Sequence, residues 1–245
     1  MQMHDAAETQ EENDKMERQI DLNEISDGKL YGANDLVKAD CGGCSGCSSC
    51  CRGMGDSILL DPLDFMRLSS ASKTDAASLL SDRVNLRAVD GLILPSLKMD
   101  PDTDACTWLD ENGRCTIHGS RPGFCRLFPL GRVYHDRTFS YFLQIHECRK
   151  ENRMKIKVKK WLDVPDIRTY EQYIADWHYF LKDLDGALKE EETGMDSESA
   201  QKLRRQVSMA VLTKFYLTPY QGEETFYQEF YERLSGLKKL FLPVS

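Results

Sequence analysis

Five cysteines fall within eleven residues of this 245-residue chain, and every residue between them is glycine or serine. They are Cys41, Cys44, Cys47, Cys50 and Cys51. A thiol at every third residue, separated by small side chains, allows a tightly curled backbone on which the sulfur atoms converge. Tetrahedral zinc and iron–sulfur clusters both require such convergence. Such a sequence is typical of neither a core helix nor a core strand. The run therefore predicts a metal centre.

The remaining four cysteines follow at Cys106, Cys115, Cys125 and Cys148. Between the first two lies Asn112-Gly113, the favoured two-residue hairpin turn. In a strict hairpin Cys115 would face Asp110, and Cys106 would lie ~13 Å further along at the rise of a strand. That distance is too long for one small centre, so the spacing predicts that these two cysteines serve different centres.

The order of the cysteines resembles the YkgJ-type cysteine-cluster family, also called the CxxCxxCC domain. The resemblance rests on Cys44-x-x-Cys47-x-x-Cys50-Cys51, then Cys106, Cys115, Arg121-Pro122 and Cys125-Arg126, and it spans roughly residues 41–150. That family is described as zinc- or iron-chelating, so the resemblance implies eight metal ligands in this chain. They are Cys44, Cys47, Cys50, Cys51, Cys106, Cys115, Cys125 and Cys148. Cys41 lies outside the pattern, and we expect it not to be a ligand.

The spacing leaves the number of centres open. Successive side chains diverge, so Cys50 and Cys51 do not easily bind one mononuclear ion. Eight ligands divide into two four-cysteine centres, although one polynuclear cluster could also accept both members of the pair. Zinc sites often combine two Cys-x-x-Cys pairs. A triple repeat with a remote cysteine is closer to bacterial iron–sulfur ligation, so we favour an iron–sulfur cluster or iron over zinc.

Two other side chains near the cysteines could take part. His118 could be a ligand, but a histidine that hydrogen-bonds the backbone at a turn is the more common case. Arg121 could offset thiolate charge or bind a substrate anion, or it could form a salt bridge that holds its loop. Phosphate-binding loops, nucleophile elbows and dinucleotide fingerprints are absent from the sequence.

Two classes of function remain open. In the first, the metal is structural or is handled by the protein, which acts as a binding or accessory factor. In the second, the centre is catalytic. Some flagellin lysine methylases are similar to this chain in carrying such a cysteine cluster. The alternative function is therefore a metal-cluster-dependent enzyme, such as a methyltransferase or a redox enzyme. A filled, buried four-thiolate centre favours the first class, and an open coordination position or a cleft beside the cluster favours the second.

Charge and composition exclude several other classes. Residues 1–40 hold 11 acidic and 4 basic side chains, which leaves 29 and 28 for the rest of the chain. A nearly neutral body with an acidic start argues against general nucleic-acid binding. We expect no membrane span, because no apolar run is long enough. The first 16 residues are polar and acidic, unlike a signal peptide, so we expect a cytoplasmic protein with reduced cysteines. A metal ion is the expected partner, and a protein partner or substrate stays unidentified.

The wider sequence predicts an α+β fold, in which an irregular cysteine-rich module of short strands and helices is covered by a C-terminal helical segment. We expect an acidic, partly disordered segment at 1–38, a cysteine-cluster metal-binding domain at 39–150 and a helical region at 151–245. Residues 1–19 lack apolar periodicity and are expected to be disordered. Apolar stripes predict three helices in the last third, the first capped by Thr169-x-x-Gln172 and the last ending near residue 241. Earlier in the chain, Asp61-Pro62-Leu63-Asp64 predicts a helix start with Asp61 as N-cap and an acid in the first turn, and a second helix is expected to begin near Thr74-Asp75. A hairpin is expected over residues 131–144, with its turn at His135-Asp136.

Overall fold

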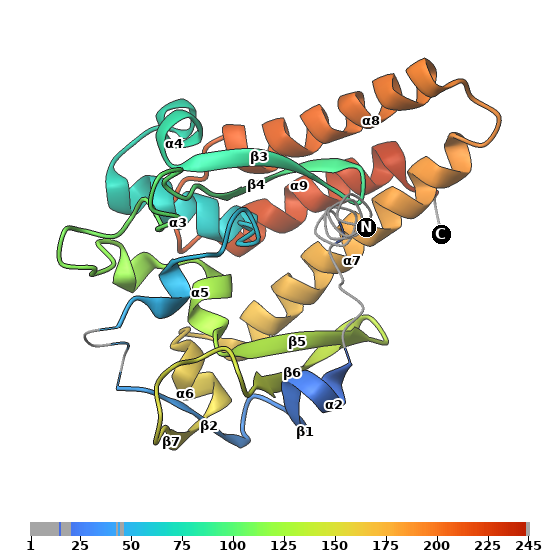
Figure 1. Cartoon of the computed structure of the whole chain (residues 1–245). Coiled ribbons are helices and arrows are strands. Elements are labelled where there is room, and N and C mark those ends of the chain that lie inside the picture. The colour runs from blue at the N-terminus through green and yellow to red at the C-terminus, as the bar shows by residue number, and fades with distance from the viewer. Residues whose placement is uncertain (1–14, 16–20, 43, 45–46, 244–245) are drawn as a thin grey trace, which may run out of the picture.

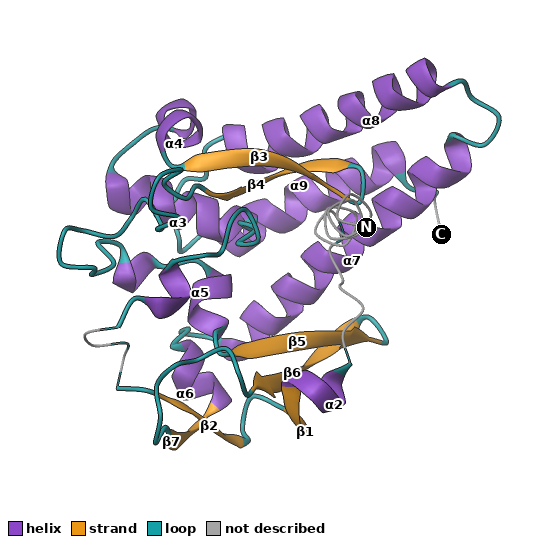
Figure 2. Cartoon of the chain, viewed as in Figure 1, coloured by secondary structure: helices purple, strands orange, loops and turns teal. Residues whose placement is uncertain are grey.

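Short antiparallel sheets and small helices form most of the chain up to residue 157, and long helices form the rest (Figure 1, Figure 2). The structure is a computed structural model that describes residues 15, 21–42, 44 and 47–243. The predicted α+β class is confirmed. Except for residue 15, the segment expected to be disordered lies outside the described residues.

Three small sheets are present in the described part of the chain. The largest has the order β1-β6-β5, with strands Ser26–Tyr31, Thr138–Gln144 and Leu130–His135. The other two are the pairs β2 (Leu36–Asp40) with β7 (Met154–Lys157) and β3 (Val84–Val89) with β4 (Leu92–Leu97). A single helical turn, α2 (Leu22–Ile25), precedes β1. The β2–β7 pair brings the segment before the cysteine run next to the segment that follows Cys148.

The predicted hairpin over residues 131–144 is present, with its turn one residue later than expected. His135 pairs with Thr138, so the turn residues are Asp136 and Arg137. Both have positive φ, 46° and 59°, as a two-residue hairpin turn requires.

The first two substantial helices begin where the sequence predicts. Helix α3 (Pro62–Ser72) has Asp61 as N-cap, and the Asp61 carboxylate accepts a hydrogen bond from the backbone N–H of Asp64. Helix α4 (Ala76–Asp82) has Asp75 as N-cap, which accepts from the N–H of Ser78. An oxygen side chain at the N-cap satisfies a free backbone donor, which is why these aspartates start helices.

The last third is helical, as predicted. Its elements are α6 (Val158–Leu162), α7 (Ile167–Glu191), α8 (Ser197–Leu212), a π-helical turn (Thr213–Leu217) and α9 (Phe226–Phe241). The predicted capping box at Thr169 is wrong, because α7 starts earlier. Its N-cap is Asp166, whose carboxylate already accepts from the N–H groups of Arg168 and Thr169.

One large apolar core joins these helices to the cysteine-rich part of the chain. Aromatic rings on α7, the π-helical turn and α9 meet in its centre, where the ring centroids of Tyr173 and Phe230 are 4.7 Å apart. Cys106 and Trp108 belong to the same core. A smaller core contains Trp161 of α6 and the inner side of β5 and β6. The helices therefore cover the cysteine module as predicted, whereas the domain boundaries stay a prediction.

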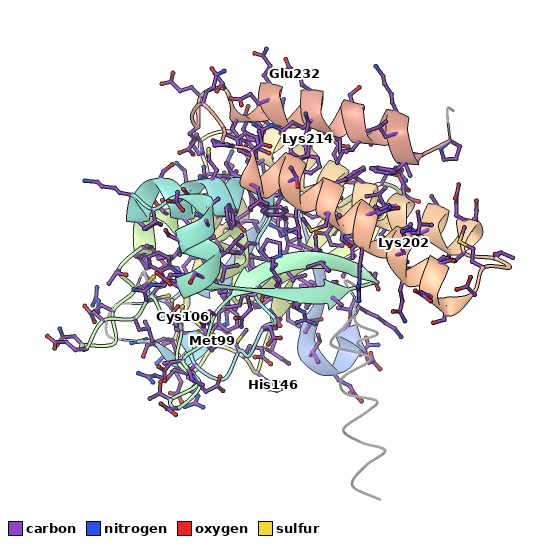
Figure 3. The ribbon with its side chains drawn as sticks, turned by 90° about the horizontal axis from the view of Figure 1, so that it is seen from above. Met99, Cys106, His146, Lys202, Lys214 and Glu232 are labelled. Carbon is purple, nitrogen blue, oxygen red and sulfur yellow. The ribbon has the colours of Figure 1, made fainter. Side chains whose placement is uncertain are left out.

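Figure 3 places Cys106 well apart from Lys202 on α8 and Glu232 on α9. In the described part of the chain, no helix is both long enough and apolar enough to cross a bilayer.

Candidate metal centre

The cysteine run curls through consecutive tight turns after β2. The N–H of Cys47 donates to the carbonyl of Cys44 at 3.1 Å, and the N–H of Cys51 donates to the carbonyl of Ser48 at 3.0 Å. Cys44 has a positive φ of 60°, which reverses the backbone direction there. Such a left-handed conformation is uncommon for residues other than glycine.

The run is fixed at its end to the segment that carries Cys106. The N–H of Cys106 donates to the carbonyl of Cys51 at 2.8 Å, and the N–H of Gly53 donates to the carbonyl of Asp104 at 2.9 Å. Two cysteines 55 positions apart in the chain are thereby hydrogen-bonded through their backbones.

The hairpin between Cys106 and Cys115 differs from the predicted one. Cys115 pairs with Leu109 rather than Asp110, so the loop has three residues, 111–113, and Gly113 has a φ of +70°. The Asp110 carboxylate accepts from the N–H of Arg114 at 2.8 Å and stabilises the longer loop. Because the chain also turns back between Cys106 and Leu109, the extended geometry that gave the ~13 Å estimate is wrong. Both cysteines line one pocket.

Cys125 lies on the short helix α5 (Gly123–Leu127), which is attached to α3 by a buried hydrogen bond. The N–H of Gly123 donates to a carboxylate oxygen of Asp64 at 2.7 Å. A Cβ at position 123 would lie 2.5 Å from the hydroxyl oxygen of Tyr170, so only glycine fits there. Sequence reasoning identified Asp64 merely as an acid in the first helical turn. Its link to Gly123 joins residues 59 positions apart, and no local pattern reveals such a contact.

All nine cysteines line two adjoining pockets, and Figure 1 shows the last turn of the run, residues 49–51, in blue beside α5. The larger pocket contains Cys44, Cys47, Cys50, Cys51, Cys106, Cys115 and Cys125. The smaller pocket contains Cys41, Cys44, Cys47, Cys50 and Cys148. Three cysteines are therefore common to both pockets.

All nine cysteines are free thiols, and they converge without yet forming a coordination shell. The sulfur atoms of Cys41 and Cys44 are 3.6 Å apart. Across the described residues, however, no three Cys, His, Asp or Glu side chains are arranged to hold a metal ion. The donor set itself fits zinc or iron, since soft thiolates suit both. Ligands usually complete their arrangement as the metal binds.

Burial makes most of these thiols hard to ionise. It is the main cause that raises the pKa of four of them, namely Cys44 (to about 12), Cys106, Cys115 and Cys125. For Cys50, a hydrogen bond with Cys51 contributes most and burial next, and both raise the pKa. Cys47 differs, because the backbone N–H of Ser49 stabilises its thiolate and lowers its pKa. A bound cation would supply the positive charge that most of these thiols need in order to ionise.

Arg121 and His118 lie together at the larger pocket. A guanidinium nitrogen of Arg121 is 2.5 Å from Nε2 of His118. Burial, followed by the charge of Arg121, lowers the pKa of His118. The histidine is therefore hydrogen-bonded to a side chain rather than to the backbone. Arg121 also lowers the pKa of Cys44 and Cys115, so its positive charge acts on the thiols.

The fold and these pockets define a cysteine-rich α+β protein whose thiols line two adjoining pockets. Residues 43–159 match the CxxCxxCC family, which bears the description "putative zinc- or iron-chelating domain". This segment is slightly less than half of the chain, and the match confirms the predicted resemblance to that family. Neither the comparison with curated proteins nor that with solved structures gives a match.

Proposed function

We propose that this protein holds iron, preferably as an iron–sulfur cluster, or zinc through the eight cysteines of its CxxCxxCC domain. The observation that carries the proposal is the convergence of all eight on two adjoining pockets, from segments as distant as residues 44 and 148. The preference for iron rests on the triple Cys-x-x-Cys-x-x-Cys repeat followed by remote cysteines. The free thiols also support a reducing compartment, and we place the protein in the cytoplasm.

Anaerobic purification without chelators, followed by metal analysis and an absorption spectrum, tests this proposal. We expect iron or zinc in near-stoichiometric amounts. Brown protein with broad absorption near ~400 nm would identify an iron–sulfur centre. Well-folded protein that contains neither metal, even after exposure to both, would overturn the proposal.

A metal-dependent enzyme, such as a methyltransferase or a redox enzyme, is the second candidate, and the wall of the larger pocket favours it. Beside the thiols, this pocket is lined by apolar side chains, among them Met54, Leu109 and Phe124, and by Arg114 and Arg121. Phe124 is 44% exposed, which is unusual for a phenylalanine whose only role is packing. An apolar cleft with a few cationic groups suits a substrate that carries a negative charge.

Two measurements on metal-loaded protein test the catalytic candidate. Reversible loss of the visible absorption with a reductant would support a redox enzyme. Calorimetric binding of S-adenosylmethionine, the common methyl donor, would support methyl transfer. Failure of both would leave the binding or accessory role.

A further inference from the structure

Cys41 lies outside the matched domain, which begins at residue 43, and yet its thiol is among the others. Its sulfur is 3.6 Å from that of Cys44. Two thiolates on one tetrahedral zinc ion, each with a Zn–S distance of ~2.3 Å, lie ~3.8 Å apart. The two sulfurs therefore already have nearly the spacing that a shared ion would give them.

The backbone explains why Cys41 and Cys148 reach the same pocket. Cys41 directly follows β2, whose last residue, Asp40, pairs with Met154 at the start of β7. Cys148 lies in the loop that leads to β7. Antiparallel pairing of β2 with β7 thus brings the two cysteines to the same end of this sheet, where both line the smaller pocket and neither lines the larger one.

The contacts of the shared cysteines divide the nine thiols into two sets. Cys50 hydrogen-bonds with Cys51, which belongs to the larger pocket only. Cys44 instead contacts Cys41. Cys47 lies close enough to Arg149 and Lys150, the neighbours of Cys148, for their charges to act on it. Five thiols thus line the smaller pocket, and its contact with Cys51 assigns Cys50 to the larger one.

We infer that Cys41 is a metal ligand, and that with Cys44, Cys47 and Cys148 it completes a second four-thiolate position. This position is separate from the one in the larger pocket, where five thiols remain to supply four ligands. The inference rests on the proposed function and revises the expectation that Cys41 takes no part. When a divalent ion binds, each of the four thiols gives its proton to solvent, and the filled position carries a net charge of −2. Arg149 and Lys150 line the pocket and offset this charge, although Glu147 also lines it.

Zinc loading of the reduced, metal-free full chain under anaerobic conditions tests the inference. We expect about two zinc ions per wild-type chain, because each four-thiolate position holds one ion. Cys41→Ala should hold half as much, with an unchanged far-ultraviolet circular dichroism spectrum. Cys41→His restores a donor and should recover part of the lost zinc. The double variant Cys41→Ala/Cys148→Ala should lose no more than either single variant, because both residues serve the same ion.

The outcomes separate the two proposals. If wild-type protein takes up no zinc and no iron, the proposed metal binding itself fails. If wild-type protein binds metal and Cys41→Ala binds the same amount, the inference about Cys41 is wrong while the metal centre stands. Complete loss of zinc from Cys41→Ala would also overturn the inference, because it would mean that the nine thiols form a single interdependent centre.

Discussion

The buried hydrogen bond between Asp64 and the N–H of Gly123 should control metal affinity from outside the thiol cluster. Asp64 is 3% exposed and accepts at 2.7 Å from the first residue of α5, the helix that carries Cys125. In Asp64→Ala, the N–H of Gly123 loses its partner. Leaving a buried donor unsatisfied costs about 1–3 kcal/mol.

This cost sets the size of the effect on the metal. If the metal binds only when α5 is docked on α3, a loss of about 2 kcal/mol weakens binding by up to about 30-fold, since each 1.4 kcal/mol is tenfold. Competition with a chelator of known zinc affinity measures this change. Asp64→Asn keeps an oxygen acceptor for Gly123 and should retain affinity close to that of the wild type.

A matched control separates docking of α5 from general destabilisation. Asp75 also caps a helix, accepting from the N–H of Ser78 at 2.8 Å, but it is exposed and this hydrogen bond joins it to its own helix. Asp75→Ala should lower the free energy of unfolding while leaving zinc affinity unchanged. If Asp64→Ala and Asp75→Ala proved alike in metal affinity, the link through Gly123 would play no part in forming the centre.

Three further outcomes are expected. Cys47→Ser and Cys125→Ser should each remove about half of the metal and lower the melting temperature, because structural thiolate sites couple metal binding to folding. Elemental analysis and thermal denaturation measure the two effects. Complete loss of metal from both variants would indicate a single centre. Deletion of residues 1–19 should change neither metal content nor melting temperature, because the segment has few apolar groups to bury. Burial, with the neighbouring Asp61 second, raises the pKa of Asp64, so the folded state keeps this proton to higher pH than the unfolded chain. Its contribution to stability is then full below about pH 4 and is lost as the pH rises through the folded pKa. Denaturant titrations of the metal-free protein should show that Asp64→Asn loses less stability than the wild type between pH 4 and 7.

Local signals in the sequence predicted most of the fold. Asp61 and Asp75 start helices because an N-cap needs only its own side chain and a donor two or three residues ahead. The apolar stripe of α7 likewise repeats within a single element. Where two local signals competed, the prediction failed. Asp166 and Thr169 both have side chains that can cap a helix. Asp166 is the N-cap of α7, because its carboxylate accepts hydrogen bonds from two backbone N–H groups.

The cysteine pattern predicted that thiols would gather but not how they divide. That Cys106 and Cys115 share a pocket depends on a turn at Leu109 and on a loop one residue longer than the Asn-Gly dipeptide suggested. The place of Cys41 depends on β2 pairing with β7, more than 100 residues away. Contacts of this kind are set by the tertiary fold, and spacing within one segment cannot reveal them.

The thiols that line the two pockets need bound metal cations in order to ionise together. Buried thiols such as Cys44 and Cys125 hold their protons, and few positive side chains face them, Arg121 being the one that acts on both Cys44 and Cys115. The few positive side chains that line the pockets, Arg114, Arg121, Arg149 and Lys150, cannot neutralise nine thiolates, so the fully ionised cluster is unstable without bound cations. Protonated thiols, in turn, hold the segments together only weakly. The same burial that keeps the metal-free thiols protonated therefore makes each bound ion a cross-link between the run, the hairpin of Cys115 and helix α5.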